Sequence, residues 1–254
     1  MSRPPRVLSS TGLYHVIFRG INHLNIFDEK EDYKKMLEIL AKLKENENIE
    51  IYAYCLMTNH VHLFLKEQKL GDIKKVMHKL LTTYVVWYNR KYQRSGSLIG
   101  NRYKSEPIED GKYYFALVRY IHQNPIRAKI CKLPNEYKWS SYNDYISKKR
   151  NTLTDKAFSL DMFSSKISEA IEYFKEFHQS DEELDFDITN TKKLTTAQIK
   201  RKIEKVSGIP AENISKLQRL ERNYVLKELR MSGLTIGQLQ RATGISRGII
   251  TNAK

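Results

Sequence analysis

The sequence is poor in cysteine: Cys55 and Cys131 are the two thiols among 254 residues. They lie far apart and outside any CxxC spacing, which argues against a disulfide framework or a thiolate zinc site. The chain also lacks an apolar run approaching the roughly 20 residues that span a bilayer. Residues 1–6 do not lead into an apolar signal segment. We therefore expect a cytoplasmic protein with reduced thiols and no membrane partner.

Acidic residues are scarce beside basic ones, since 29 Asp and Glu face 44 Lys and Arg and the formal net charge is +15. Such an excess favours a polyanionic partner, because each phosphate that is neutralised releases counterions. Residues 155–190 carry 3 lysines against 10 acidic residues, whereas 191–254 carry 14 basic residues against 4 acidic ones. This distribution predicts basic nucleic-acid-binding units at 1–150 and 191–254, joined by a partly helical acidic connector at 151–190. Alternatively, the acidic run at 181–187 is only a solvated linker.

Strand and helix patterns alternate through the first unit. Period-two alternation predicts strands at 13–19, 49–57, 60–65 and 103–108, and apolar spacing of three and four predicts helices at 29–46, 71–92 and 113–124. Pro125 is expected to end the last of these helices. The order β-α-β-β-α-β-α predicts an α+β fold, with a ferredoxin-like antiparallel sheet covered by helices on one face.

Two histidines separated by one apolar residue are the most informative part of this pattern. In a strand His60 and His62 point to one side, while the apolar residues between and after them point to the core. In the last predicted helix, Tyr120 shares a face with Gln123 and Asn124. If that face approaches the histidines, two imidazoles, an amide and a phenol converge. The alternative is a strand with solvent-facing histidines and a core tyrosine.

Four motifs in order carry a resemblance to a known family. They are Tyr-Cys-Leu-Met-Thr-Asn-His-Val-His-Leu at 54–63, Asn-Arg-Tyr-Lys-Ser at 101–105, Arg-Tyr-Ile-His-Gln-Asn-Pro-Ile-Arg-Ala at 119–128 and Trp-Ser-Ser-Tyr at 139–142. Over roughly residues 8–146 the chain resembles the one-tyrosine HUH transposases, in the branch of the REP-associated tyrosine transposases. Thr58 departs from the proline expected in that branch, although a turn tolerates either residue. The resemblance implies the HUH nuclease fold and metal-dependent cleavage of single-stranded DNA with hairpin structure.

The resemblance also implies residue roles: Tyr120 as nucleophile, His60 and His62 as metal ligands, and Asn124 as third ligand with Gln123 as the alternative. A phenol with a pKa near 10 is a poor nucleophile at neutral pH, so a cation that polarises the phosphate would assist it. Two imidazoles and an amide suit Mn²⁺, and Mg²⁺ is the other candidate. The product would be a 5′-phosphotyrosine with a free 3′-hydroxyl, which can be rejoined without a nucleotide triphosphate.

Polar residues next to these motifs are candidate DNA contacts: Arg19, Asn22, Arg102 and Lys104. The alternative for the last two is a basic edge strand. Aromatic residues of the helix at 71–92 could stack unpaired bases, but their helical spacing favours the core. His15 and His122 have no matched partner in the sequence, so we predict structural roles for both.

The last unit has helical periodicity at 194–206 and 217–231, followed by a helix, a turn and a helix over 235–250. Gly244 permits a left-handed turn and Ser246 can cap the next helix. The segment resembles a helix-turn-helix, with distant similarity to the DnaA C-terminal DNA-binding domain. That resemblance implies duplex DNA as a partner of a small all-α domain, with contacts from Gln240, Ser246, Arg247 and Asn252. A helical hairpin used for packing is the alternative.

These features together predict a metal-dependent single-stranded DNA endonuclease and strand transferase. One alternative is a non-catalytic DNA-binding regulator derived from a transposase. A second is an RNA-binding protein, because ferredoxin-like sheets also serve that function. A helical tyrosine can act in its own active site or in a partner's, so the sequence leaves open whether the chain is a monomer or a homodimer.

Overall fold

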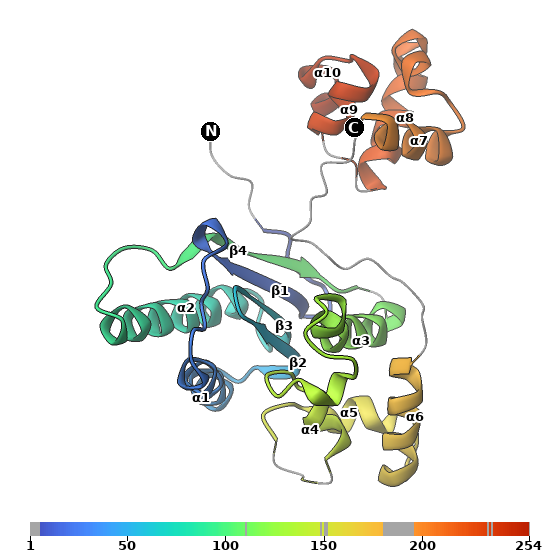
Figure 1. The fold of residues 1–254 in the computed structure, drawn as a ribbon. Helices are drawn as coiled ribbons and strands as arrows, with labels where there is room; N and C mark the ends of the chain where they lie inside the picture. The colour runs from blue at the N-terminus through green and yellow to red at the C-terminus, as the bar shows by residue number, and fades with distance from the viewer. Residues whose placement is uncertain are drawn as a thin grey trace. The chain divides into compact units, whose positions relative to one another are not determined.

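The computed structural model describes residues 6–109, 111–147, 149, 152–179, 196–232, 234 and 236–253. The chain divides into two compact units, Met1–Thr189 and Asn190–Lys254 (Figure 1). The acidic run predicted at 181–187 lies outside the described residues.

The first unit contains a four-stranded antiparallel sheet with the strand order β2-β3-β1-β4. Its strands are β1 (Leu13–Gly20), β2 (Glu50–Met57), β3 (His60–Lys66) and β4 (Ile99–Pro107). Strands β2 and β3 are joined by the two-residue turn Thr58–Asn59, as predicted. The α+β class and the order of the elements are confirmed, and β4 begins earlier than the sequence pattern indicated.

Helices cover both faces of this sheet, which corrects the expectation of one covered face (Figure 1). The helices of the first unit are α1 (Lys30–Glu47), α2 (Asp72–Lys91), α3 (Gly111–Arg127), α4 (Tyr142–Ile146), α5 (Lys156–Asp161) and α6 (Ile167–Gln179), with short 3₁₀ turns η1 (Ile21–His23) and η2 (Pro134–Glu136). Helices α1 and α2 share one apolar cluster with the sheet, and α3 to α6 share another. The central strands are apolar on both sides, as Leu63 and Phe64 show, so each side needs a cover.

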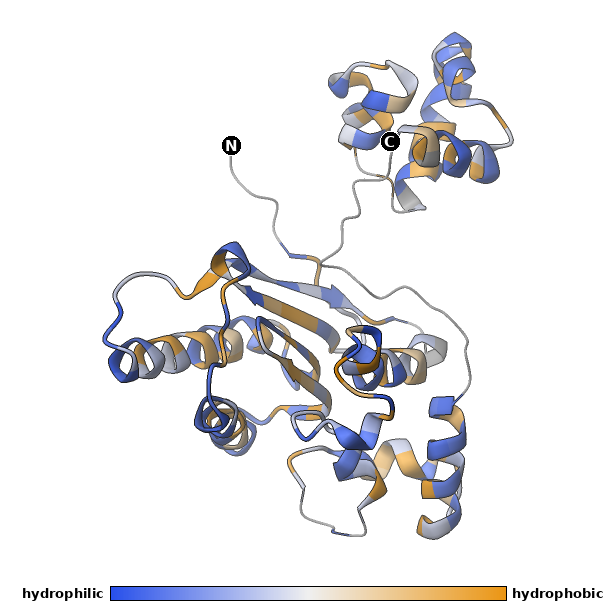
Figure 2. Ribbon diagram, viewed as in Figure 1, coloured by the Kyte–Doolittle hydropathy of each residue, from blue (hydrophilic) through white to orange (hydrophobic). Residues whose placement is uncertain are grey.

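Alternate strand residues build the cluster beneath α1 and α2. Its strand members include Tyr14, Val16, Phe18, Val61, Leu63 and Leu65, and its helix members include Met36, Leu40, Val76 and Leu80. Figure 2 shows apolar residues recurring along these strands and helices. Tyr84 and Tyr88 of α2 are buried in the same cluster. The α2 aromatics therefore form core, in line with their helical spacing.

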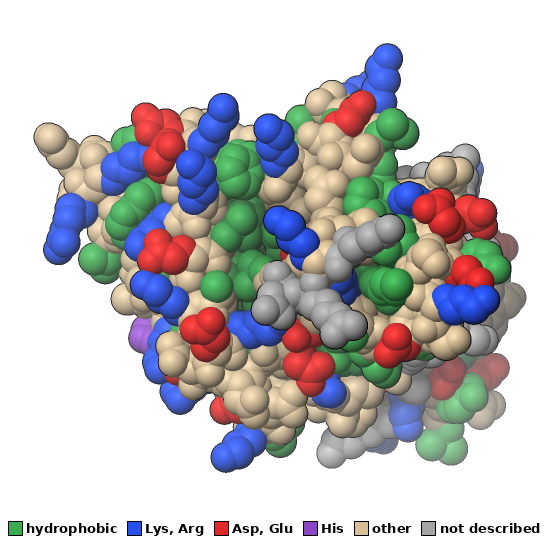
Figure 3. All heavy atoms as spheres, turned by 90° about the horizontal axis from the view of Figure 1, so that it is seen from below, with side chains coloured by type: hydrophobic (Ala, Val, Ile, Leu, Met, Phe, Trp, Pro, Cys, Tyr) green, Lys and Arg blue, Asp and Glu red, His purple; other side chains and the backbone are tan. Residues whose placement is uncertain are grey.

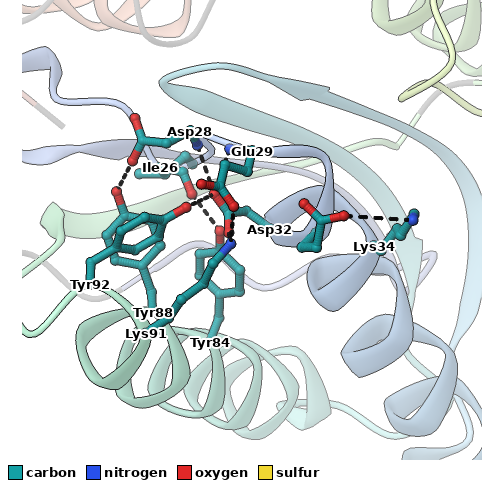
Figure 4. A network of polar contacts seen from close by, with 10 residues as sticks. Ile26, Asp28, Glu29, Asp32, Lys34, Tyr84, Tyr88, Lys91 and Tyr92 are labelled. Atoms are coloured by element: carbon teal, nitrogen blue, oxygen red, sulfur yellow. Dashed lines mark hydrogen bonds and ion pairs between the residues drawn. The ribbon is translucent and has the colours of Figure 1, made fainter.

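A polar network ties the start of α1 to the end of α2 (Figure 4). The fully buried Asp32 carboxylate accepts hydrogen bonds from the backbone N–H groups of Asp28 (2.8 Å) and Glu29 (2.9 Å). It also accepts from Lys91 Nζ at 2.7 Å and from the Tyr92 hydroxyl at 2.8 Å. Burial alone would raise the pKa of Asp32, but these donors together lower it below its ordinary value. The charge is therefore satisfied within the fold.

Helix α3 continues through Pro125 to Arg127, so the prediction that the proline ends the helix is wrong. Proline lacks the N–H that would bond to the carbonyl of Ile121. The side-chain amide of Asn124 donates to the carbonyl of Tyr120 at 2.9 Å and approaches that of Ile121 at 3.5 Å. A side-chain donor thus helps to satisfy the carbonyls around the interruption.

The segment after α3 closes the outer edge of β2. The Leu56 N–H donates to the carbonyl of Trp139 at 2.8 Å, and the Ser141 N–H donates to that of Tyr54 at 3.0 Å. Beyond it, α5 and α6 pack into the α3-side cluster through Leu160, Ala170 and Phe174. Packing of the first unit thus extends past residue 150 and includes the described part of the segment predicted as a connector.

The second unit is helical and has its own apolar core. It comprises α7 (Thr196–Ser207), η3 (Ala211–Lys216), α8 (Arg219–Met231), α9 (Ile236–Thr243) and α10 (Arg247–Asn252). Gly244 has φ +72°, the left-handed turn that was predicted. Ser246 stands at the N-cap of α10, although its side chain makes no capping hydrogen bond with the described residues. Ile250 is buried in the core, whereas Ile249 is 39% exposed. Across the described residues, every helix is too short or too polar to cross a bilayer.

Candidate active site and nucleic-acid interface

Helix α3 brings Tyr120 against the histidine side of the sheet. The alternation of β3 places His60 and His62 on one side, with ring centroids 5.1 Å apart. The Tyr120 ring lies edge-on to His62, with the centroids 5.6 Å apart, and its side chain is 5% exposed. Three of the predicted site residues therefore meet at one place.

A further histidine, His15, completes this cluster. Ile17 of β1 lies opposite His62 of β3, so His15 occupies the diagonal position on the same side of the sheet. Its Nε2 lies 3.1 Å from Nδ1 of His62, and the two rings stack at 5.4 Å. The His15 ring also lies 5.9 Å from that of Tyr120. The sequence pattern gave His15 no partner, because the partner becomes visible only when β1 is known to lie beside β3.

Hydrogen bonds restrict which imidazole nitrogens can hold a cation. Nδ1 of His62 faces His15, so coordination by His62 would use Nε2. Nδ1 of His60 lies 2.7 Å from the side-chain oxygen of Asn59, which accepts, so His60 would also use Nε2. Burial lowers the pKa of His62 well below its ordinary value, and the positive charges near it, including that of Arg19, act in the same direction. A neutral imidazole is the form that binds a metal ion.

The spacing of the two imidazoles fits a shared cation. Two imidazoles bound to one ion at about 2.1 Å, with a bond angle of roughly 90–110°, have ring centroids roughly 4.5–5.3 Å apart, and the observed separation is 5.1 Å. Within the described part of the chain, no group of three His, Cys, Asp or Glu side chains could hold a metal. A third protein ligand would therefore be an amide. Two imidazoles and one amide leave positions for water and phosphate oxygens.

The side-chain amides of Asn124 and Gln123 donate to different parts of the fold. The Asn124 amide nitrogen donates to the carbonyl of Tyr120, which turns its oxygen away from the helix's own carbonyls. The Gln123 amide nitrogen donates to the carbonyl of His178 at 3.0 Å and so ties α3 to α6. In both residues the amide nitrogen is engaged, so ligation by either would use the side-chain oxygen.

Arg127 is a neighbour of Tyr120 that the sequence reasoning did not select. Its guanidinium lies 5.0 Å from the centroid of the Tyr120 ring. The two residues are seven apart, which is close to two helical turns, so helical periodicity could have identified the pair. A positive charge beside the phenol favours negative charge on the phenol or on a phosphate close to it.

Arg19 and Asn22 lie at the end of β1 next to this site. Arg19 is half-buried and stands opposite His60 in the β1–β3 register. Asn22 is exposed and has a left-handed backbone with φ 49°. The loop between them folds tightly, because a Cβ on Gly20 would lie 2.0 Å from the carbonyl oxygen of Leu24. The structure thus holds Arg19 on the histidine side and Asn22 at the surface.

Arg102 and Lys104 lie along β4, the outer strand of the sheet next to β1. Both are exposed, and together with Arg6 they line a cleft of about 650 Å³. Lys104 stands opposite Ile17, in the same cross-strand row as His62. Arg6 lies over the ring of Tyr103 at 3.7 Å. The cleft therefore presents three cations beside the edge of the sheet.

In the second unit, two of the four predicted contacts lie in a common cleft. Ser246 and Asn252 line a cleft of about 410 Å³ together with Arg219, Arg222 and Asn223 of α8. The Arg222 Nε is buried and has no hydrogen-bond partner within the described residues. Sequence reasoning considered only α9 and α10, and so it missed the arginines of α8.

The remaining predicted contacts, Gln240 and Arg247, are exposed outside that cleft. On the face drawn in Figure 3, Lys and Arg side chains are scattered among acidic and hydrophobic ones. The basic excess is therefore not gathered into a continuous patch on that face. The clefts along β4 and between α8 and α10 are better candidates for contact with a polyanion.

The chain is similar to a known protein family and to solved structures. The family model described as "Transposase IS200 like" matches residues 9–124. A solved structure of a REP-associated tyrosine transposase bound to a REP hairpin is similar with a TM-score of 0.50 and 17% identity, over 62% of this chain and 96% of that one. A putative transposase from Deinococcus radiodurans R1 is similar with a TM-score of 0.33 and 18% identity, over 48% and 95%. None of the curated proteins matches. The first of these structures shares the fold of the sheet and its helices.

Proposed function

Residues 9–124 belong to the IS200-like transposase family, and we propose that this chain is an HUH tyrosine transposase that nicks and rejoins single-stranded DNA. The observation that carries the proposal is the Tyr120 ring beside the His60–His62 pair within the matched segment. A REP-associated tyrosine transposase of the same fold is known bound to a REP hairpin, which supports a hairpin-flanked substrate and this branch of the family.

The proposed reaction begins when the Tyr120 hydroxyl oxygen attacks the phosphorus of a phosphodiester. A bond forms between that oxygen and phosphorus, and the bond from phosphorus to the 3′ oxygen breaks. The phenol loses one proton and the 3′ oxygen gains one, so the products are a 5′-phosphotyrosine and a 3′-hydroxyl. Attack of a 3′-hydroxyl on the phosphotyrosine reverses these changes and rejoins a strand without a co-reactant.

The residues around Tyr120 suit this reaction. His60, His62 and Asn124 would hold a divalent cation, Mg²⁺ or Mn²⁺, which when bound polarises the phosphate oxygens. Arg127 holds a positive charge over the phenol ring. His60 and Asn124 are half-buried, whereas His62 and Tyr120 are buried. We infer that the phosphate approaches from the side of His60 and Asn124.

The test is the covalent adduct. With Mn²⁺ and a hairpin-flanked single strand, the wild-type protein should form a protein–DNA adduct that survives denaturing electrophoresis, and Tyr120→Phe should form none. Tyr113→Phe is the matched control, because Tyr113 is 46% exposed on the same helix and should keep the adduct. Persistent nicking by Tyr120→Phe would refute the assignment. Absence of an adduct from the wild type across hairpin substrates would favour a non-catalytic DNA-binding regulator.

For the second unit we propose duplex DNA as the partner, with phosphate held in the cleft between α8 and α10. The supporting observation is the buried Arg222 Nε beside Arg219, Ser246 and Asn252. A phosphate oxygen in this cleft would accept hydrogen bonds from the guanidinium groups of Arg219 and Arg222.

Duplex binding measured against salt concentration tests this contact. Arg222→Gln should weaken binding and lower the slope of log affinity against log salt by about 1. Lys227→Gln is the control, since Lys227 is exposed on the same helix outside the cleft and its replacement removes the same charge. Equal effects of the two variants would mean that the cleft holds no phosphate.

A further inference from the structure

We propose that His15 is a positioning residue that selects the tautomer of His62 in which Nε2 can bind the cation. The inference rests on the proposed function, because it concerns the cation site of that reaction. It assigns a role to a third histidine that lies outside the ligand set.

The contact between the two rings is short, buried and held by two paired strands. His15 Nε2 and His62 Nδ1 are 3.1 Å apart, the rings are 20° from parallel, and the side chains are 0% and 1% exposed. Backbone pairing of β1 with β3 runs from Leu13 to Arg19, so it extends past both histidines. Because both side chains are buried, neither ring can rotate away without displacing the side chains packed around it.

One hydrogen atom lies between these two nitrogens, and its position decides whether His62 can ligate. If Nδ1 of His62 carries it, Nε2 of His62 keeps a lone pair for the cation. If Nε2 of His15 carries it, a neutral His62 has its own hydrogen on Nε2 and cannot coordinate there. Coordination by His62 therefore requires His15 to accept at Nε2, which places the hydrogen of a neutral His15 on Nδ1. Metal-bound histidines ordinarily donate their second N–H in this way, which fixes the orientation of the ring.

A second histidine pair in the same unit shows what a purely structural pair looks like. His178 Nδ1 faces the carbonyl of Phe174 at 2.9 Å, so it donates, and His178 Nε2 must accept from His122 Nδ1 at 3.0 Å. His122 Nε2 then accepts from the Ser141 hydroxyl at 2.7 Å. Both nitrogens of each ring are thus engaged with protein groups. In the other pair the contact joins Nε2 of His15 to Nδ1 of His62, and Nε2 of His62 is the nitrogen that would bind the cation.

The experiment measures Mn²⁺ binding by calorimetry, without DNA, on the full chain. His15→Leu removes the acceptor and should weaken Mn²⁺ binding by about 10- to 100-fold. His15→Gln keeps an acceptor oxygen at similar reach and should recover most of that loss. His178→Gln, in the structural pair, should leave the affinity for Mn²⁺ unchanged.

Long-range ¹H–¹⁵N spectra of the imidazoles give a readout that is independent of metal binding. In the wild type we expect the hydrogen of His62 on Nδ1, and in His15→Leu a shift of population toward Nε2. A wild-type His62 with its hydrogen on Nε2 overturns the proposal, even if His15→Leu does not fold.

Mn²⁺ binding by the wild type and by His15→Leu separates an error in the cation site from an error in the role of His15. If the wild type binds no Mn²⁺, the cation site of the proposed function is wrong, and the role of His15 falls with it. If the wild type binds Mn²⁺ and folded His15→Leu binds it equally well, only the role of His15 is wrong.

Discussion

The sheet face beneath α1 and α2 and the face beneath α3 use alternate residues of the same strands, yet they hold polar groups differently. On the first face, the buried carboxylate of Asp32 is satisfied by Lys91, Tyr92 and backbone N–H groups. On the second, His15 and His62 pair with each other beside Tyr120. The carboxylate on the first face closes a structural network, whereas His15, His62 and Tyr120 on the second face converge on one point. Burial alone therefore does not tell a structural polar side chain from one in the proposed active site. The groups to which its hydrogen bonds are made do.

Neighbouring residues of β3 offer the largest test of this contrast. Leu63 is fully buried on the α1/α2 face, so Leu63→Ala should lower the free energy of unfolding by about 2–5 kcal/mol. Mn²⁺ affinity per folded molecule should stay the same. His62→Ala should instead lower Mn²⁺ affinity by more than about 100-fold, with a smaller loss of unfolding free energy. Urea unfolding and calorimetry on both variants measure the two effects. If both variants changed the unfolding free energy and the Mn²⁺ affinity by similar amounts, the two faces would not differ in role.

Much of this contrast could be predicted from the sequence, because alternation along a strand is a local property. The His60–His62 spacing and the apolar residues between and after them were enough to assign opposite faces. The partner of His15 could not be predicted, since it depends on β1 pairing with β3 in a particular register. The prediction that Pro125 ends the helix was wrong for a different reason. The proline deprives the carbonyl of Ile121 of its N–H donor, and the side-chain amide of Asn124 lies 3.5 Å from that carbonyl.

The helices that pack on the second face could not be predicted from local sequence patterns either. His122 was predicted to be structural, and the structure shows why: its partners are His178 of α6 and Ser141. These contacts join segments 56 and 19 residues away in the chain. Nothing in the helical periodicity of α3 indicates which later helix will pack on it. The strands could therefore be predicted, but the expectation that helices cover one face was wrong, because the packing of α3 to α6 on the second face depends on contacts between distant segments.

Asp32 gives the next largest effect and belongs to the first face. Asp32→Asn leaves Lys91 without its closest carboxylate, and we expect a loss of about 3 kcal/mol in unfolding free energy at pH 7. The pKa of Asp32 is lowered in the fold, so its contribution is complete above the unfolded pKa of about 3.9 and disappears as pH falls through the folded value.

Urea unfolding at pH 7 and pH 3 would follow this loss. The difference between wild type and Asp32→Asn should shrink at the lower pH. Glu31→Gln is the control, because Glu31 faces Lys34 at 3.9 Å on the exposed side of α1 and should contribute almost nothing. A difference that stays constant with pH would mean that the charge of Asp32 does not stabilise the first face.

His178 gives the smallest effect and reports on the second face at a higher pH. Burial lowers its pKa to about 4, whereas the unfolded imidazole titrates near 6.5, so the unfolded state takes up the proton first. The unfolding free energy of the wild type should therefore fall by about 1–2 kcal/mol through this group between pH 7 and pH 5. His178→Gln keeps a hydrogen-bonding side chain without the titration and should show a shallower decline.

Burial also lowers the pKa of His62 and of His122, so part of the decline should persist in His178→Gln. Asp32→Asn is the cross-control: it should keep the full decline between pH 7 and pH 5, because its own window lies below about pH 4. The two faces would then lose stability in separate pH ranges. If His178→Gln declined as steeply as the wild type, the acid sensitivity of the second face would belong to the other two histidines, and the α3–α6 contact would contribute none of it.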